Sequence, residues 1–257
     1  MIDIVKAIIL GITEGLTEFL PISSTGHLIL VGHWIKFESP TFDIAIQLGA
    51  ILAVIVLYRS FFFSLLPPQN WKKKEVKLIA IAIAPALILG FLCHSAIKHY
   101  LFGTFTVIMA LLVGGIIMLL VERLLPYKPT TTDISDITYK QATIIGVAQC
   151  ASLWPGMSRS GSTIVGGLLA KLDYETAAKF SFIISVPIMI AATGYDLLKS
   201  YHLLTQSDLS LIGVGFLVSF IVGYLAIVTF IKLLVRWKLA PFAIYRIILA
   251  GILLLQC

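Results

Sequence analysis

One stretch of the chain reads Gly11-Ile-Thr-Glu-Gly-Leu-Thr-Glu-Phe-Leu-Pro-Ile-Ser-Ser-Thr-Gly-His27, and it places acids, hydroxyls and a histidine in otherwise apolar surroundings. Glu14 and Glu18 are four residues apart, so on a helix they share one face, where like charges repel. A charged side chain inside a membrane costs roughly 2.5–3.5 kcal/mol on insertion scales unless it is paired, protonated or hydrated. The pair therefore indicates a site for a cation, for proton transfer, or for both.

The composition of the whole chain is that of a membrane protein. Of 257 residues, 59% are hydrophobic and 12% are charged, and the mean hydropathy is +1.00. A soluble domain carries about 25% charged residues. We therefore predict an all-α polytopic integral membrane protein in a lipid bilayer, without a soluble domain. The net charge of +6 comes from bases in short loops, which fits the topology bias of membrane proteins better than nucleic-acid binding.

Apolar segments divide the chain into spans and hairpins. Pro21 interrupts the first apolar segment, and non-helical backbone at membrane depth survives only inside protein or beside a water-filled cavity. Residues 2–35 and 142–169 are therefore predicted to form two re-entrant helical hairpins, although 2–20 could alternatively be an ordinary spanning helix. About six transmembrane helices are predicted in addition, at 42–58, 76–97, 105–121, 177–198, 209–234 and 242–255.

Basic residues in the loops predict the orientation. With six spans and two hairpins, the loops 59–77, 123–140 and 232–238 fall on one side of the membrane. They hold most of the lysines and arginines, so this side is expected to be cytoplasmic. The first hairpin then opens outward, the second opens inward, and both termini lie outside.

The two halves of the chain resemble each other weakly. The matching positions are Gly11 with Gly146, Glu14 with Gln149, Pro21 with Pro155, and Ser24-Thr-Gly26 with Arg159-Ser-Gly161. We interpret the chain as a single membrane domain, 1–257, whose halves at about 1–125 and 138–257 form an inverted repeat. Such repeats bring broken helices together near the bilayer midplane, so the two hairpins are expected to meet.

The second hairpin carries the groups that suit an anion. Arg159 stays protonated, and its planar guanidinium can pair with two oxygens of a phosphate. Small polar residues from both turns are predicted to bind phosphate with it: Ser23, Thr25, Gly156, Ser158, Ser160, Gly161 and Thr163. The alternative is that Arg159 only neutralises Glu14 or Glu18 across the interface of the repeats.

The first hairpin carries the reactive groups. Glu14 and Glu18 could hold a hard divalent cation, Mg²⁺ or Ca²⁺, which bridges phosphate oxygens. Alternatively, one of them is a general acid or base. His27 could transfer a proton near neutral pH, and Ser24 is the best candidate nucleophile, with Ser23 and Thr25 as rivals. Carboxylates, cation, arginine and serine together favour phosphoryl transfer.

These residues resemble the signature motifs of a known family. Glu14-x-x-x-Glu18, the turn Pro21-Ile-Ser-Ser-Thr-Gly-His27 and the turn Pro155-Gly-Met-Ser-Arg-Ser-Gly-Ser-Thr163 are similar to those of the bacterial undecaprenyl-diphosphatases of the bacitracin-resistance type. The resemblance extends over essentially the whole chain and includes Phe42-Asp-Ile-Ala-Ile-Gln-Leu-Gly-Ala.

The resemblance implies hydrolysis of undecaprenyl diphosphate to undecaprenyl phosphate and inorganic phosphate, which recycles the lipid carrier of peptidoglycan synthesis. It also implies a multi-pass protein of the bacterial inner membrane, a site open to the periplasm, a divalent-cation requirement and bacitracin resistance. The catalytic residues that it implies are Glu14, Glu18, Ser24, His27 and Arg159. Whether two copies pair as a homodimer is left open.

Two alternative functions can be compared with the sequence. Lipid phosphatases of the acid-phosphatase superfamily carry a histidine six residues beyond an arginine, whereas the residue six past Arg159 is Val165, so this family is rejected. A transporter or lipid flippase is suggested by the repeat and the intramembrane charges. Phosphate release from the purified protein would separate an enzyme from a transporter.

Overall fold

The fold is described from a computed structural model that covers residues 1–257. It describes all of them except 1, 38, 102, 125–127, 201–205 and 256–257. The described residues form helices, and their single β-bridge joins Thr131 to Leu172. The elements in chain order are α1 Ile2–Thr17, α2 Ser24–Ile35, α3 Pro40–Leu57, α4 Arg59–Leu65, η1 Pro68–Lys72, α5 Lys74–Leu92, α6 His94–Tyr100, α7 Thr104–Leu124, η2 Ile134–Asp136, α8 Tyr139–Gln149, η3 Cys150–Leu153, α9 Arg159–Leu169, α10 Tyr174–Ser200, α11 Gln206–Trp237 and α12 Ala240–Leu254.

The all-α membrane fold is confirmed. Among the described residues, five helices are long and apolar enough to cross a bilayer, namely α3, α5, α7, α10 and α11. The sixth predicted span, 242–255, is the shorter apolar helix α12, with 15 residues. The span predicted at 76–97 is interrupted, because α5 ends at Leu92 and α6 begins at His94.

The outer faces of the spans are suited to lipid. Large apolar side chains lie exposed there, as for Phe91 on α5 (80% exposed) and Leu225 on α11 (60% exposed). A water-soluble surface rarely exposes such residues over a contiguous area. The multi-pass assignment therefore rests on side-chain exposure as well as on segment length.

Capping residues set where several helices begin. Ser39 accepts a hydrogen bond from the N–H of Phe42, and Pro40 occupies the first position of α3, where its missing N–H costs nothing. Thr138 and Gln141 form a reciprocal capping box at the start of α8. These local signals separate the long spans from the shorter hairpin helices.

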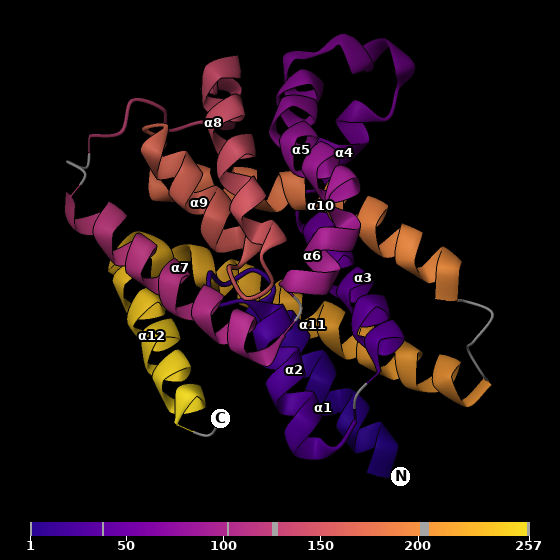
Figure 1. Ribbon diagram of the computed structural model, residues 1–257. Helices are drawn as coiled ribbons and strands as arrows, with labels where there is room; N and C mark the ends of the chain where they lie inside the picture. Colours follow the sequence, from indigo (N-terminus) through magenta and orange to yellow (C-terminus); the bar gives the residue numbers. More distant parts are fainter. Residues whose placement is uncertain (1, 38, 102, 125–127, 201–205, 256–257) are drawn as a thin grey trace.

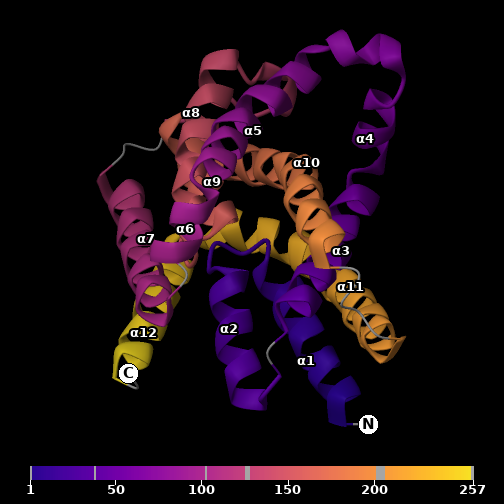
Figure 2. The same cartoon turned by 45° about the vertical axis from the view of Figure 1, so that its right-hand side comes forward.

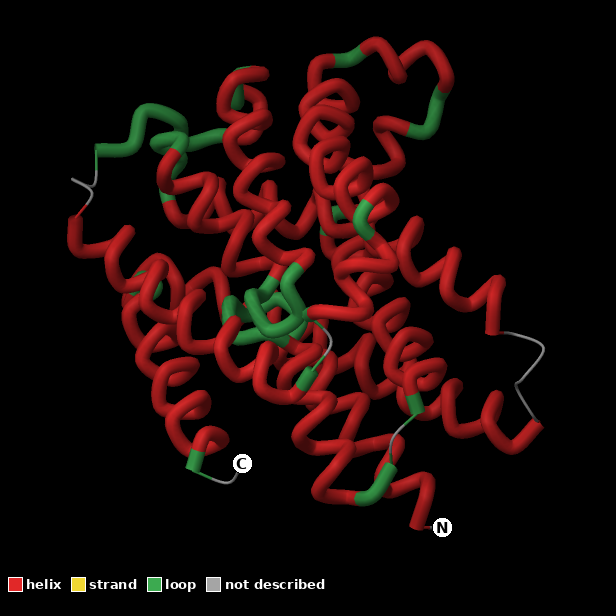
Figure 3. Tube along the Cα trace, viewed as in Figure 1, coloured by secondary structure: helices red, strands yellow, loops and turns green. Residues whose placement is uncertain are grey.

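The two predicted hairpins are present. α1 ends at Thr17 and α2 begins at Ser24, so a helical hairpin forms in place of a single span over 2–20. Figure 2 shows α1 and α2 side by side below the centre of the molecule, with α8 and α9 approaching from the other side. Figure 3 shows their connecting loops meeting at the centre. We call residues 18–24, which include the first residue of α2, the first turn, and residues 154–160, which include the first two residues of α9, the second turn.

The basic loops lie together, away from the chain termini. In Figure 1 the segment from α4 to α5 is at the top, and both ends of the chain are at the bottom. The Lys74 ammonium donates to the carbonyl of Ser135 at 2.6 Å, which joins the loops 59–77 and 123–140. This agrees with the predicted placement of these loops on one side. The inverted repeat of 1–125 and 138–257 stays a prediction.

Candidate active site

The first turn presents a polar helix start to the centre of the molecule. Ser23 has a positive φ of 72°, and its hydroxyl caps α2 by accepting from the N–H of Gly26 at 3.3 Å. Glu18 continues the last turn of α1, since its N–H donates to the carbonyl of Glu14 at 2.9 Å. The sequence Glu-Phe-Leu-Pro-Ile-Ser thus places an acid on one side of the turn and hydroxyls on the other.

The second turn repeats this local geometry. Ser158 has a φ of 73° and caps α9 by accepting from the N–H of Gly161 at 3.1 Å. Ser23 and Ser158 therefore occupy equivalent cap positions, as the alignment of Gly26 with Gly161 predicts. Both helices direct their N-termini toward the meeting turns, where unpaired N–H groups and the helix dipole favour an anion.

An ion pair joins the two turns. The Arg159 Nη2 atom lies 3.0 Å from Glu18 Oε1, and the Ser24 hydroxyl donates to the other carboxylate oxygen of Glu18. The Ser160 hydroxyl also donates to the carbonyl of Leu20 at 2.8 Å. Three of the predicted catalytic residues are thus in direct contact, although Arg159 lies 141 positions from Glu18 in the sequence.

Arg159 is held from a second direction by α10. Its Nη1 group donates to the carbonyl of Ser181 at 3.1 Å, and Ser181 in turn exchanges a hydrogen bond with Thr163 at 2.6 Å. The Nε–H of Arg159 is buried and has no partner. The pairing of Arg159 with an acid is therefore seen, and this pairing does not use all five N–H donors of the guanidinium.

Glu14 is the carboxylate of the site that has no hydrogen-bond partner on either oxygen. Its side chain is 0% exposed. Glu18 and Asp43 lie close enough to repel it electrostatically. A buried carboxylate without partners is costly, so these residues fit a divalent cation, whose preferred ligands are oxygen atoms. No cluster of three or more His, Cys, Asp or Glu ligands occurs in the part of the chain that the structure describes.

His27 lies beside the site and not against Ser24. Its Nδ1 atom is 2.7 Å from the carbonyl of Ser23, and its Nε2 atom is 2.7 Å from the hydroxyl of Tyr245. Because a carbonyl only accepts, Nδ1 carries a proton, and in the neutral imidazole Nε2 then accepts from the hydroxyl of Tyr245. The two rings are stacked, 5.6 Å apart. In this arrangement the only predicted catalytic group on the Ser24 hydroxyl is Glu18.

Tyr245→Phe should change the behaviour of His27 without disturbing packing. The variant removes one hydroxyl and leaves the stacked ring, so Nε2 loses its donor and the imidazole gains freedom to reorient. We expect about a threefold to tenfold loss of turnover, the size of one neutral hydrogen bond, with only a small loss of thermal stability. A pH–rate profile of both proteins checks this, and an unchanged profile and rate would remove Tyr245 from the site.

The structure places the other residues predicted to bind phosphate in different surroundings. Thr163 lies one turn along α9, and its hydroxyl also donates to the carbonyl of Arg159 at 2.9 Å. Gly156 packs against α7, where an added Cβ would come within 2.5 Å of the Val107 carbonyl. Thr25 is partly exposed at the start of α2. Gly156 thus serves the packing of the second turn, and its φ of 98° explains the need for glycine.

Three neighbours of the site were missed by sequence reasoning: Ser181, Tyr245 and Arg246. Tyr245 and Arg246 are adjacent in the last apolar helix, and a charged residue there is unusual inside a membrane. The charge of Arg246 in an apolar helix is the sequence signal by which these two residues could have been found. Ser181 has none, because a serine within a span is common and only the fold places it beside Arg159.

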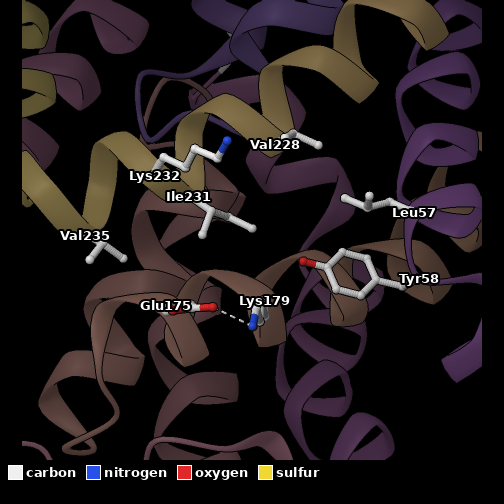
Figure 4. A pocket seen from close by; sticks show the side chains of 8 residues that line it. All are labelled: Leu57, Tyr58, Glu175, Lys179, Val228, Ile231, Lys232 and Val235. Atoms are coloured by element: carbon white, nitrogen blue, oxygen red, sulfur yellow. Dashed lines mark ion pairs between the residues drawn. The ribbon is translucent and has the colours of Figure 1, made fainter.

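A separate pocket lies away from the two turns. It has a volume of about 600 Å³ and is lined by Leu57, Tyr58, Glu175, Lys179, Val228, Ile231, Lys232 and Val235. Figure 4 shows Glu175 and Lys179 paired within it, at 2.6 Å. None of the predicted site residues lines this pocket, and the reactive groups remain those of the turns.

Comparison with known proteins gives the family. Residues 7–252 match the family model described as bacitracin resistance protein BacA. The chain belongs to the BacA family. It is 51% identical over 257 residues to "Undecaprenyl-diphosphatase 1" of Bacillus anthracis, with 97% of each chain covered. The protein of the same name from Bacillus thuringiensis (strain Al Hakam) has the same identity and coverage.

The match to the BacA family extends over both turns and all five long spans. The resemblance deduced from the sequence motifs is therefore confirmed. The roles of the individual residues are a separate matter, because family membership by itself assigns none of them.

Proposed function

We propose that the protein hydrolyses undecaprenyl diphosphate to undecaprenyl phosphate and inorganic phosphate. The observation that supports this most directly is the contact of Glu18 with both Ser24 and Arg159, where the two turns meet. An acid, a hydroxyl and a guanidinium then surround one point, and two helix N-termini face it. The apolar outer surface of the spans suits the isoprenoid tail of such a substrate.

Each residue of the turns has a proposed role. Arg159 and the N-termini of α2 and α9 bind the diphosphate oxygens and stabilise the charge that develops on them. The Ser24 oxygen attacks the terminal phosphorus while its proton passes to Glu18. The bond to the bridging oxygen breaks, and that oxygen leaves with undecaprenyl phosphate. Water then hydrolyses the phosphoserine; direct attack by a water molecule on the same phosphorus is the alternative.

Two further roles complete the proposal. Glu14 and Glu18 would hold Mg²⁺ or Ca²⁺, and the cation would neutralise phosphate charge when bound. Mg²⁺ often binds through only one or two carboxylates together with water and substrate phosphates, so two protein ligands are sufficient. His27 exchanges protons at the edge of the site through Tyr245 and does not act directly on Ser24.

We also propose that the site faces the periplasm from the bacterial inner membrane. The basic loops lie on the side opposite the chain termini and the open end of the first hairpin, and basic loops favour the cytoplasm. Recycling of the lipid carrier for peptidoglycan synthesis and bacitracin resistance would follow from the reaction. A homodimer stays a prediction.

Phosphate release is the experiment that tests the function. Purified protein in detergent is given undecaprenyl diphosphate, with undecaprenyl phosphate as the control lipid, and inorganic phosphate is measured. We expect release from the diphosphate alone. Release from neither lipid would favour the transporter alternative, which transport of the lipid across vesicles would then examine.

Glu14→Gln tests the proposed cation role. The amide keeps the shape of the side chain and removes its charge, so the site loses one anionic ligand while the fold gains relief from a buried charge. We expect about a hundredfold weaker cation binding, measured by calorimetry with Mg²⁺ alone, and a thermal stability that is equal or higher. Cation affinity equal to that of the unaltered protein would exclude Glu14 as a ligand.

A further inference from the structure

A fully buried arginine on the last helix contacts both turns. Arg246 lies on α12 and is 0% exposed. No carboxylate lies within ion-pair distance of it in the described part of the chain. An unpaired buried charge is expensive, so the surroundings of this guanidinium must compensate for it in another way.

Backbone carbonyls provide that compensation. A guanidinium has five N–H donors, and Arg246 directs five hydrogen bonds of 2.9–3.2 Å to carbonyl oxygens. The acceptors are Pro21 of the first turn, Gly156 and Met157 of the second turn, and Ala110 and Leu111 of α7. A longer contact of 3.7 Å reaches the sulfur of Met118.

The acceptors explain why an arginine is needed at this depth. Carbonyls in the two turns lie outside regular helix, and unsatisfied backbone groups in a membrane interior cost several kcal/mol each. One side chain satisfies three of them and holds them at fixed positions around a planar group. Met157 is two residues from Arg159, and Pro21 is three residues from both Glu18 and Ser24, so these carbonyls control where the reactive groups lie.

We propose that Arg246 is a positioning residue, which clamps the two turns together so that Glu18 and Arg159 meet in register. It touches neither of these side chains and acts through the backbone of each turn. The effect on rate rests on the proposed function, whereas the clamping itself does not.

Two variants disturb the clamp in different ways. Arg246→Lys keeps the positive charge but offers three donors from one nitrogen, which cannot span both turns and α7. Gly114→Ala keeps the arginine in the sequence but adds a Cβ that would lie 2.1 Å from the Nη2 atom and 2.7 Å from the Cζ atom of Arg246, so the guanidinium has to move. Gly115→Ala is the matched control, because its Cβ would press on Ile247 and the Ala243 carbonyl of the same helix pair, and would reach Arg246 only at its Cβ, at 3.4 Å, which is an ordinary contact distance away from the guanidinium.

Steady-state kinetics form the first measurement. We expect both clamp variants to lose about a hundredfold in kcat, the effect of a misplacement of about 1 Å, with KM changed by less than about threefold. The control should lower the melting temperature in detergent and keep a kcat near that of the unaltered protein. Wild-type kcat in Arg246→Lys, or equal losses in Gly114→Ala and Gly115→Ala, would overturn the proposal.

Cross-linking forms the second measurement and needs no activity. In a chain whose native cysteines are replaced, Leu20→Cys and Ser160→Cys place one thiol on each turn, at positions where the Ser160 hydroxyl donates to the Leu20 backbone carbonyl at 2.8 Å. We expect oxidation to link them readily, and more slowly when Arg246→Lys or Gly114→Ala is added. Unchanged linking rates would show that Arg246 does not hold the turns together, even if no phosphate release were found in any variant.

Discussion

Arg159→Ala is expected to reduce phosphate release from undecaprenyl diphosphate by about a thousandfold or more, the lower range for removing an arginine from a phosphoryl-transfer site. The side chain is the only cation in contact with Glu18 among the described ion pairs, and its buried Nε–H has no hydrogen-bond partner. Its removal takes away charge that stabilises the transition state.

Arg159→Lys separates this role from simple charge neutralisation. Alanine would leave the Glu18 carboxylate buried without its partner, which costs about 3–5 kcal/mol and lowers stability as well as rate. Lysine retains the ion pair but loses the planar fork that contacts Glu18 and Ser181 together. We expect Arg159→Lys to keep most of the thermal stability and still to lose most of the turnover.

The measurements are initial rates and melting temperatures of the unaltered protein, Arg159→Ala and Arg159→Lys in the same detergent. If Arg159→Lys restored both stability and turnover, the guanidinium would serve only to neutralise Glu18. The alternative interpretation, that Arg159 only neutralises an acid, would then be correct, and the anion would have to be bound by the helix N-termini and the proposed cation.

Glu18→Gln should have the second largest effect, a loss of about a hundredfold to a thousandfold in kcat. The amide is nearly isosteric and can still accept from Arg159, so the two turns stay joined. It cannot take the proton of Ser24, which lies in hydrogen-bond contact with Glu18. Loss of a general base typically costs 10²–10⁴-fold.

Ser24→Ala provides the matched comparison. If Glu18 acts by activating Ser24, the two residues work as a unit, and the double variant should be hardly slower than either single variant. Effects that multiply would mean that Glu18 acts independently of Ser24, through the cation or on a water molecule. Turnover near wild type in Glu18→Gln would contradict both roles.

The fold was largely predictable from the sequence because lipid imposes a simple rule. Spans must be apolar and about 20 residues long, and a polar interruption must be buried in protein or face a water-filled cavity. These rules placed the five long spans and both hairpins. They predicted the span at α12 less well, because an apolar helix of 15 residues cannot be distinguished from a buried helix by composition.

The polar residues of the two turns were also recognisable from the sequence. Glu18, Ser24 and Arg159 are costly in an apolar chain, so their presence alone pointed to a shared site. The contact between Glu18 and Arg159 follows the predicted meeting of the hairpins. What the sequence determined, then, was which residues are too polar to face lipid.

The tertiary structure alone decided how those residues are paired. His27 bonds Tyr245 in place of Ser24, Glu14 is left without a partner, and Arg246 bonds carbonyls from both turns and α7. Pairings of this kind depend on polar atoms brought within hydrogen-bond distance by helices that are far apart in the chain. Hydropathy reports the cost of burying each group separately, whereas the partner that offsets that cost is set by packing.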